Sequence, residues 1–333
     1  MSSNPRSRGA RRALTARSRR ALTARSRRPL TAPALLLAAC GALSALAAGC
    51  GASFPASAAA PGKPRVVAAE NFWGSLAKQL GGDRVVVSSL IVNPDTDPHA
   101  YDPTVADAVG LARSEMAIVN GIGYDRWSSQ LLAADAPRPP IVLDVGDLLG
   151  LREGANPHQW YSPASVERVI TAIAADYERL DPRDAAYFER RRIEIEQRGL
   201  AGYRRMLALI RGRYHGVAVG YSESIFEPLG RALGLRLLTP ARFARAIAEG
   251  TEVSAGDTRT VEAQARNHEI DVWVYNRQNT TPDVERANQA ARAAHIPIVA
   301  ITETLAPASA SFQQWQVSEL TGLLRALEEA TGR

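Results

Sequence analysis

Cysteine is nearly absent from this 333-residue chain: the two present, Cys40 and Cys50, both lie within the first 50 residues. Residues 51–333 therefore form no disulfide bond and offer no thiolate to a metal ion. Any metal site in that part of the chain must use nitrogen and oxygen ligands. Histidine is scarce as well, with five residues in the chain, so the position of each one is informative.

Acidic residues are absent from residues 1–50, where ten arginines precede the apolar run "PALLLAACGALSALAAGC". This order is typical of an export signal. The ending "LAAGC" resembles a bacterial lipoprotein signal with Cys50 as the lipidated residue, and Cys40 in "LLAAC" is the alternative. We expect residues 51–63, which are mostly small and include proline, to form a flexible tether between a lipid anchor and a folded body.

Basic charge is also lacking beyond that segment, although the whole chain has a net charge of +6. Without the ten N-terminal arginines, 30 basic residues stand against 34 acidic ones. Nucleic-acid binding needs an excess of basic charge, so we expect no nucleic-acid partner. The N-terminal apolar run is too short and too rich in small residues to predict a membrane span. We expect a globular, monomeric body.

Short apolar runs rich in β-branched residues alternate with helical patterns after residue 63. Continuous apolar strands separated by helices predict parallel sheets covered on both faces. The predicted strands form two groups of four: residues 65–70, 85–92, 115–120 and 140–145, then 216–222, 235–240, 271–276 and 297–303. The pattern predicts an α/β protein with two lobes, residues 64–162 and 215–333. Each lobe would hold a mostly parallel four-stranded sheet flanked by helices.

Residues 163–214 lie between the two groups and contain no strand pattern. One amphipathic helix is predicted from Pro163 to about Asp181. The residues after Pro182 contain no further proline up to residue 214, and at about 1.5 Å per residue they would form more than about 40 Å of helix. We predict a long, rigid spine helix that joins the lobes, with Gly199 and Gly202 weakening its middle. The alternative is two separate helices packed on one lobe.

Four side chains that can bind metal lie at the ends of predicted strands. His99 in "NPDTDPHAYDPT" follows the second strand, and His158 in "GANPHQWYSP" follows the fourth. Glu223 and Glu303 lie at the ends of the fifth and eighth strands. Ligands of parallel α/β sheets bind beyond the carboxyl ends of the strands, so the four side chains would meet between the lobes. Two imidazoles and two carboxylates suit zinc or manganese.

Each of these residues also has a simpler interpretation when it is taken alone. A loop histidine is commonly a surface side chain, Glu223 could favour a helix N-terminus, and Glu303 could be a solvated loop acid. The shared position at strand ends favours a common site. The remaining histidines, His215, His268 and His295, lie near the starts of strands or the ends of helices, where we expect them to cap or pack.

The same segments resemble the solute-binding lipoproteins of bacterial zinc/manganese ABC importers. "NPDTDPHAYDPT" is similar to the family's D-P-H-x-[FY]-[ED]-P loop, and "NPHQWYSP" is similar to its [ND]-P-H-x-W-x-[DS]-P motif. "GYSESIFEPLGRALGL" resembles the segment of the third ligand, and "VWVYNRQNTT" with "IPIVAITETLAP" resembles the C-terminal block. The resemblance covers nearly all of residues 64–330.

The resemblance implies a metal site with contributions from both lobes. Its ligands would be His99, His158, Glu223 and Glu303. The candidates for residues beside them are Asp97, Tyr101 and Asp102 next to His99, and Asn276 or Arg277 after the seventh strand. Many zinc-binding members have histidine at the third position, where this chain has Glu223, and the fourth ligand is commonly aspartate. Oxygen ligands favour manganese, whereas the general order of affinities favours zinc, so both metals stay open.

The implied function is capture of one zinc or manganese ion outside the cell and its delivery to the permease of an ABC importer, without catalysis. The protein would be anchored as a lipoprotein to the outer face of the cytoplasmic membrane. One alternative is a two-lobed lipoprotein for a metal chelate such as haem or a siderophore, whose cleft would carry aromatic and arginine side chains. The other is an exported metallohydrolase, although the sequence contains neither H-E-x-x-H nor G-x-S-x-G.

Overall fold

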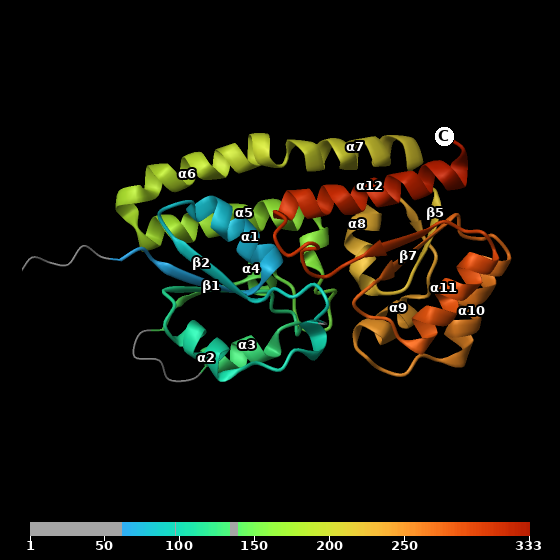
Figure 1. Ribbon diagram of the computed structural model, residues 1–333, viewed down its shortest axis with the longest axis horizontal. Helices are drawn as coiled ribbons and strands as arrows, with labels where there is room; N and C mark the ends of the chain where they lie inside the picture. Colours follow the sequence, from blue (N-terminus) through green and yellow to red (C-terminus); the bar gives the residue numbers. More distant parts are fainter. Residues whose placement is uncertain (1–61, 97, 134–138) are drawn as a thin grey trace, which may run out of the picture. The chain divides into compact units, whose positions relative to one another are not determined.

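The computed structural model describes residues 62–333, apart from Asp97 and residues 134–138 (Figure 1). Cys40, Cys50 and the expected signal lie outside the described residues. No helix in the described part of the chain is both long enough and apolar enough to cross a membrane.

The first sheet has four parallel strands in the order β2-β1-β3-β4. Its strands are β1 (Arg65–Glu70), β2 (Val86–Ile91), β3 (Met116–Val119) and β4 (Ile141–Asp144). Its helices are α1 (Asn71–Gly81), α2 (Val105–Ala112), α3 (Arg126–Leu132) and α4 (Val145–Leu149). Both faces are covered, because Val66 and Ala68 belong to one apolar core while Val67 and Ala69 belong to another.

The second sheet repeats this arrangement with four parallel strands in the order β6-β5-β7-β8. Its strands are β5 (Ala218–Tyr221), β6 (Arg236–Leu237), β7 (Val272–Asn276) and β8 (Ile298–Ile301). Its helices are α8 (Glu227–Ala232), α9 (Ala241–Ala248), α10 (Ala255–Arg266), α11 (Pro282–Ala293) and α12 (Phe312–Thr331). The two parallel four-stranded sheets flanked by helices confirm the predicted fold class, and all eight strands lie within their predicted ranges.

The connection between the sheets is helical, as predicted, but the expected single long helix is divided. The connection begins with α5 (Pro163–Leu180), the first predicted helix. The predicted long helix after it consists of α6 (Ala185–Glu194), a π-helical turn (Ile195–Gly199) and α7 (Ala201–Tyr214). The amide of Leu200 donates to the carbonyl of Ile195, five residues earlier, so the turn holds one extra residue. Helix α6 packs on α1 and α5, whereas α7 packs on α12. The alternative of two helices on one lobe was therefore wrong.

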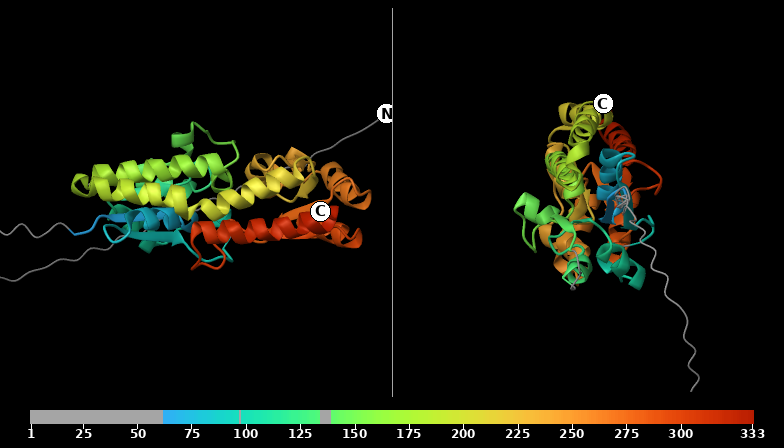
Figure 2. Two further views of the ribbon diagram at one scale, coloured as in Figure 1. Left: turned by 90° about the horizontal axis from the view of Figure 1, so that it is seen from above. Right: turned by 90° about the vertical axis from the view of Figure 1, so that its left-hand side faces the viewer.

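Helix α12 is a second connection between the lobes, and the sequence did not predict it. It lies beside α7 in both Figure 1 and Figure 2 and also contacts α1 of the first lobe. At its start, the amide of Phe312 donates to Ser75 Oγ (3.0 Å), and the side chains of Gln79 and Gln313 hydrogen-bond each other. Buried residues of both sheets belong to one apolar cluster, which includes Val66 and Val219. The two lobes therefore share a core.

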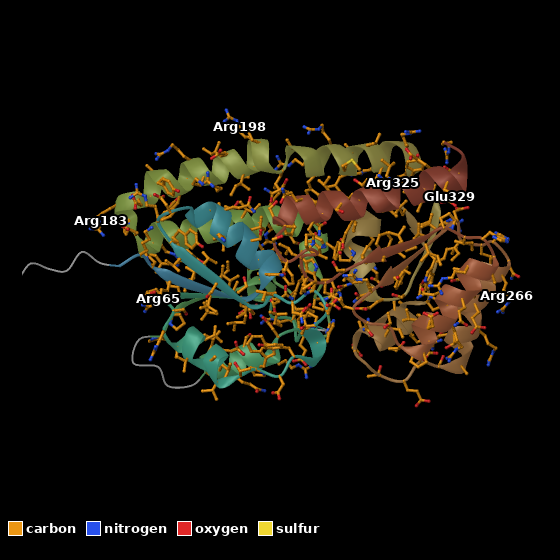
Figure 3. The ribbon with its side chains drawn as sticks, in the orientation of Figure 1. Arg65, Arg183, Arg198, Arg266, Arg325 and Glu329 are labelled. Carbon is orange, nitrogen blue, oxygen red and sulfur yellow. The ribbon has the colours of Figure 1, made fainter. Side chains whose placement is uncertain are left out.

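Many arginine side chains lie at the surface, away from this core. Figure 3 shows Arg183 and Arg198 pointing outward from the connecting helices and Arg266 from α10. Buried aromatic side chains pack around the start of α12, where Phe312 contacts Tyr203 and Trp315. This apolar junction, formed by Tyr203, Phe312 and Trp315, joins the two lobes.

Truncation of the junction should destabilise both lobes together. Phe312 is fully buried, so Phe312→Ala should lower the free energy of unfolding by about 3–5 kcal/mol. Urea unfolding followed by tryptophan fluorescence and by circular dichroism should give one shared transition at a lower midpoint. The control Ser318→Ala, on the exposed side of the same helix, should change the free energy by less than about 0.5 kcal/mol. Two separate transitions, with one unmoved, would show that the lobes fold independently.

Candidate metal centre

Four side chains from the segments that follow four strands lie together between the lobes, and helix α4 separates β4 from the loop that carries His158. His99 is in the 3-10 turn Pro98–Ala100 after β2, and His158 directly precedes the 3-10 turn Gln159–Tyr161. Glu223 follows β5 and Glu303 follows β8. One nitrogen or oxygen of each side chain lies within 4.8 Å of those of the other three. The structure thus brings together the four residues that the sequence analysis singled out.

The distances between the four groups are close to those of ligands around a single ion. His99 Nε2 lies 3.4 Å from His158 Nε2, 3.5 Å from Glu303 Oε2 and 3.9 Å from Glu223 Oε1. His158 Nε2 lies 3.5 Å from Glu223 Oε1. A tetrahedral ion with bonds of about 2.0–2.1 Å separates its ligand atoms by about 3.3–3.4 Å. A small cation therefore fits among them with little movement.

Burial differs among the four side chains and defines the open side of the site. The side chains of His158, Glu223 and Glu303 are fully buried, whereas that of His99 is 20% exposed. His99 lines a cavity of about 900 Å³ between the lobes, together with Tyr124 and Asn156. Solvent therefore reaches the cluster from the side of His99.

Asn156 sets the orientation of His158. Its Oδ1 lies 2.9 Å from His158 Nδ1 and also accepts the His158 amide (3.0 Å), while its Nδ2 donates to the carbonyl of Ser224 (2.7 Å). These contacts assign the proton to Nδ1 and leave the lone pair of Nε2 facing the cluster. Burial lowers the pKa of His158 well below its ordinary value, and the neighbouring His99 adds to this effect. His158 is therefore neutral at physiological pH, as a metal ligand must be.

Aromatic rings line the histidine side of the cluster. The ring of Tyr124 meets His99 edge-on at 4.7 Å between centroids, and the ring of Trp160 meets His158 in the same way at 5.2 Å. Trp160 in turn stacks on Phe72 of α1 at 4.0 Å. Rigid rings on these sides fix the imidazole planes and reduce the local dielectric constant, which strengthens the attraction between a cation and the carboxylates.

Asn276 and Tyr124 hold the two carboxylates. Asn276 Nδ2 donates to Glu223 Oε2 (2.9 Å) and to Glu303 Oε1 (2.7 Å), and the Tyr124 hydroxyl donates to Glu303 Oε2 (2.5 Å). Gln278 fixes the backbone beside them, since its Oε1 accepts the amide of Glu303 (2.6 Å) and its Nε2 donates to the carbonyl of Thr96 (2.7 Å). The loop before His99 is thereby tied to the segment that carries Glu303.

The other predicted neighbours of the ligands have different surroundings. The Tyr101 hydroxyl donates to Asp107 (2.9 Å), its ring packs on Trp127, and burial raises its pKa to about 12. Asp102 is exposed and lines the cavity. Asp97 lies outside the described residues. The roles of these three residues beside a bound ion stay predictions.

The remaining histidines do not belong to the four-residue cluster within the described part of the chain. His268 and His295 have positive φ angles, 52° and 54°, and follow the ends of α10 and α11. They therefore terminate helices, as expected. The site contains supporting residues that the sequence analysis missed: Asn156, Tyr124, Gln278, Tyr161 and Glu319. Asn156 stands two residues before His158 in the quoted loop, and Tyr124 follows the strand β3, so both could have been found.

Glu319 of α12 connects the segments that carry His158 and Glu303. Its Oε1 accepts hydrogen bonds from the Thr302 amide (2.8 Å) and from Trp315 Nε1 (2.9 Å), and its Oε2 accepts one from the Tyr161 hydroxyl. Tyr161 lies three residues after His158, and Thr302 precedes Glu303. Burial raises the pKa of Glu319 to about 7, against an ordinary value of 4.5. This carboxyl group thus fixes both lobes at the base of the site.

The raised pKa predicts a pH-dependent contribution of Glu319 to stability. A carboxyl group with a higher pKa in the folded state favours folding while it is protonated, below about pH 4.5, and this contribution is lost as the pH rises towards 7. The loss is at most on the order of 3 kcal/mol. The stability of the wild type minus that of Glu319→Gln, measured by urea unfolding of metal-free protein, should therefore fall between pH 4.5 and 7.

The matched control for this measurement is Glu329→Gln, which removes an exposed carboxylate from the same helix (Figure 3). It should not show the same fall. A difference between wild type and Glu319→Gln that stayed constant or grew with pH would contradict the assignment.

The fold is shared with solved metal-binding proteins. The Mn-bound periplasmic metal-binding protein of Candidatus Liberibacter asiaticus matches with a TM-score of 0.66 and 18% identity, over 80% of this chain and 100% of that one. The solute-binding protein FpvC of Pseudomonas aeruginosa, solved in complex with Mn²⁺, matches with a TM-score of 0.65 and 19% identity, over 80% and 99%. At these identities the likeness establishes the fold: the two-lobed fold of periplasmic metal-binding proteins.

Proteins with similar sequences are also named as metal-binding proteins. The chain is 31% identical to the iron-binding protein YfeA of Yersinia pestis over 134 residues, which are 38% of this chain and 43% of YfeA. It is 26% identical to the manganese-binding lipoprotein MntA of Halalkalibacterium halodurans over 149 residues, 44% of this chain and 49% of MntA. The matches thus span about half the length of these relatives. The family model described as "Zinc-uptake complex component A periplasmic" matches residues 66–326, and the chain belongs to that family. The resemblance predicted from the sequence motifs is confirmed.

Proposed function

We propose that this protein captures one divalent transition-metal ion, zinc or manganese, outside the cell and delivers it to the membrane permease of an ABC importer. The ligands in this proposal are His99, His158, Glu223 and Glu303. Cys50 would carry the lipid that anchors the chain to the outer face of the cytoplasmic membrane, and the ion is cargo rather than a catalytic cofactor.

The proposal rests mainly on one observation: the metal-binding groups of His99, His158, Glu223 and Glu303 lie close together. Two imidazoles and two carboxylates meet within 4.8 Å, and three of these four side chains are fully buried. Two carboxylates would neutralise the charge of a divalent ion, and buried, neutral His158 supplies a nitrogen lone pair without first losing a proton. Four protein ligands fill a tetrahedral ion and leave no position for a catalytic water, which favours transport over hydrolysis.

The comparisons support a metal as the cargo. The relatives carry names that refer to manganese and iron, the similar solved structures hold manganese, and the family is described by zinc uptake. Periplasmic binding and lipoprotein anchoring are likewise properties that these names give to the relatives. For this chain, delivery to a permease and anchoring through Cys50 follow from family membership and from the N-terminal sequence.

Metal content tests the proposed site directly. Protein purified without a chelator or an affinity tag, then exposed to equimolar zinc and manganese, should retain one equivalent of metal by mass spectrometry. The double variant His99→Ala/His158→Ala should retain none, because it removes both nitrogen ligands.

The control His215→Ala/His268→Asn removes two imidazoles outside the cluster and should keep its metal. Asparagine is chosen at position 268 because it tolerates the positive φ angle found there. Metal retained equally by wild type and by the His99/His158 variant would contradict the ligand assignment. Wild-type protein that retains no stoichiometric metal would refute the proposed function and favour a chelate as cargo.

Loss of the residue that orients His158 should weaken binding without abolishing it. In Asn156→Ala the imidazole lacks its Nδ1 partner, so the metal affinity should fall by about 10–100-fold while one ion still binds. Competition with a metal-chelating dye measures the affinity. Asn267→Ala, which removes an exposed amide in the second lobe, should leave it unchanged, and an unchanged affinity in Asn156→Ala would contradict the orienting role.

A further inference from the structure

Asn276 lies between the two glutamates because of the strand order. Strand β7, which ends at Asn276, lies between β5 and β8, whose ends lead to Glu223 and Glu303. The Asn276 side chain is fully buried. Its Oδ1 accepts the amide of Gln278 (2.9 Å), so Nδ2 faces the carboxylates. This nitrogen carries two hydrogens and donates to both glutamates, at 2.9 Å and 2.7 Å.

Each glutamate therefore has one oxygen on Asn276 and the other towards the histidines. Glu223 Oε2 and Glu303 Oε1 accept from the amide, whereas Glu223 Oε1 and Glu303 Oε2 lie 3.5 Å from an imidazole nitrogen. Bidentate coordination would turn both oxygens of a glutamate towards the ion and move one of them out of its present alignment with Asn276 Nδ2. Weakening the hydrogen bond of a buried donor is unfavourable. The hydrogen bonds thus favour one oxygen from each glutamate.

Coordination number distinguishes the two metals left open above. Zinc is stable with four nitrogen and oxygen ligands in a tetrahedron, whereas manganese is typical of octahedral sites rich in oxygen. Reaching six ligands here would require two further oxygens, from both glutamates becoming bidentate, from two waters, or from one of each. Three of the four side chains are fully buried, and the cavity borders His99, so water reaches the ion from one side.

We propose that Asn276 is a specificity-determining residue: by keeping Glu223 and Glu303 monodentate, it makes the site four-coordinate and selective for zinc over manganese. The inference rests on the proposed function, since it assumes that these four residues hold the ion. Preference for zinc alone does not test it, because most sites of nitrogen and oxygen ligands favour zinc. The test is whether the preference depends on the amide of Asn276.

The experiment compares wild type with Asn276→Ala for binding of zinc alone and of manganese alone, by competition with a chelating dye. The variant frees the second oxygen of each glutamate, so the ratio of manganese to zinc affinity should rise by about 10–100-fold. X-ray absorption should count four nitrogen and oxygen ligands around zinc in the wild type and additional oxygen around manganese in the variant. Asn279→Ala is the matched control, because that amide donates to the carbonyl of Ile247 outside the cluster; it should leave the ratio unchanged.

The outcomes separate the two proposals. A ratio unchanged by Asn276→Ala, or bidentate glutamates around zinc in the wild type, would overturn the role of Asn276 while metal capture stands. A wild type that binds neither ion would overturn the proposed function itself. If Asn276→Ala fails to fold, Asn276→Ser, which leaves a smaller cavity and at most one donor, replaces it, and the wild-type X-ray absorption decides the coordination number independently.

Discussion

Two carboxylates buried side by side are the constraint on which the rest of the structure depends. Glu223 and Glu303 are fully buried and share the amide of Asn276. Burying like charges is unfavourable unless donors or a cation compensate them. The acidic surroundings extend further, since burial raises the pKa of Glu70, with Asp125 and then Glu303 adding to the effect. Under the proposed function, a divalent cation would relieve this repulsion.

A site under such repulsion keeps its geometry only if the scaffold is stiff. The carboxylates belong to the second lobe and the imidazoles to the first, so the distance between them depends on how firmly the lobes are joined. A shared apolar core, helix α12 and the connection from Tyr161 through Glu319 to Thr302 fix that distance. Gln278 adds a link to the loop before His99. Capture by a largely preformed site follows more naturally from this arrangement than closure of two loosely hinged lobes.

The sequence predicted those parts of the structure that depend on local pattern and on the topology of parallel sheets. Continuous apolar runs defined the eight strands, and the rule that strand ends converge grouped His99 and His158 with Glu223 and Glu303. Asn276 was predicted as a neighbour because it lies at the end of the seventh predicted strand. Glu319 could not be predicted, because it lies in the middle of a helix whose path across both lobes is a tertiary property. The π turn at Ile195–Gly199 was missed for a related reason: the helical pattern on both sides does not reveal one inserted residue.

Selectivity through a neutral amide differs physically from selectivity through ligand identity. Exchanging a histidine for a glutamate changes the charge and the softness of the site, and by that criterion two glutamates move it towards manganese. Asn276 adds no charge and does not touch the ion, yet it limits how many oxygens the same glutamates present. Ligand composition and ligand denticity can therefore favour opposite metals at one site. Because the amide is buried and its oxygen is held by the Gln278 backbone, it cannot turn away at low cost. On the proposed role of Asn276, denticity outweighs composition, and the residue types alone do not decide between zinc and manganese.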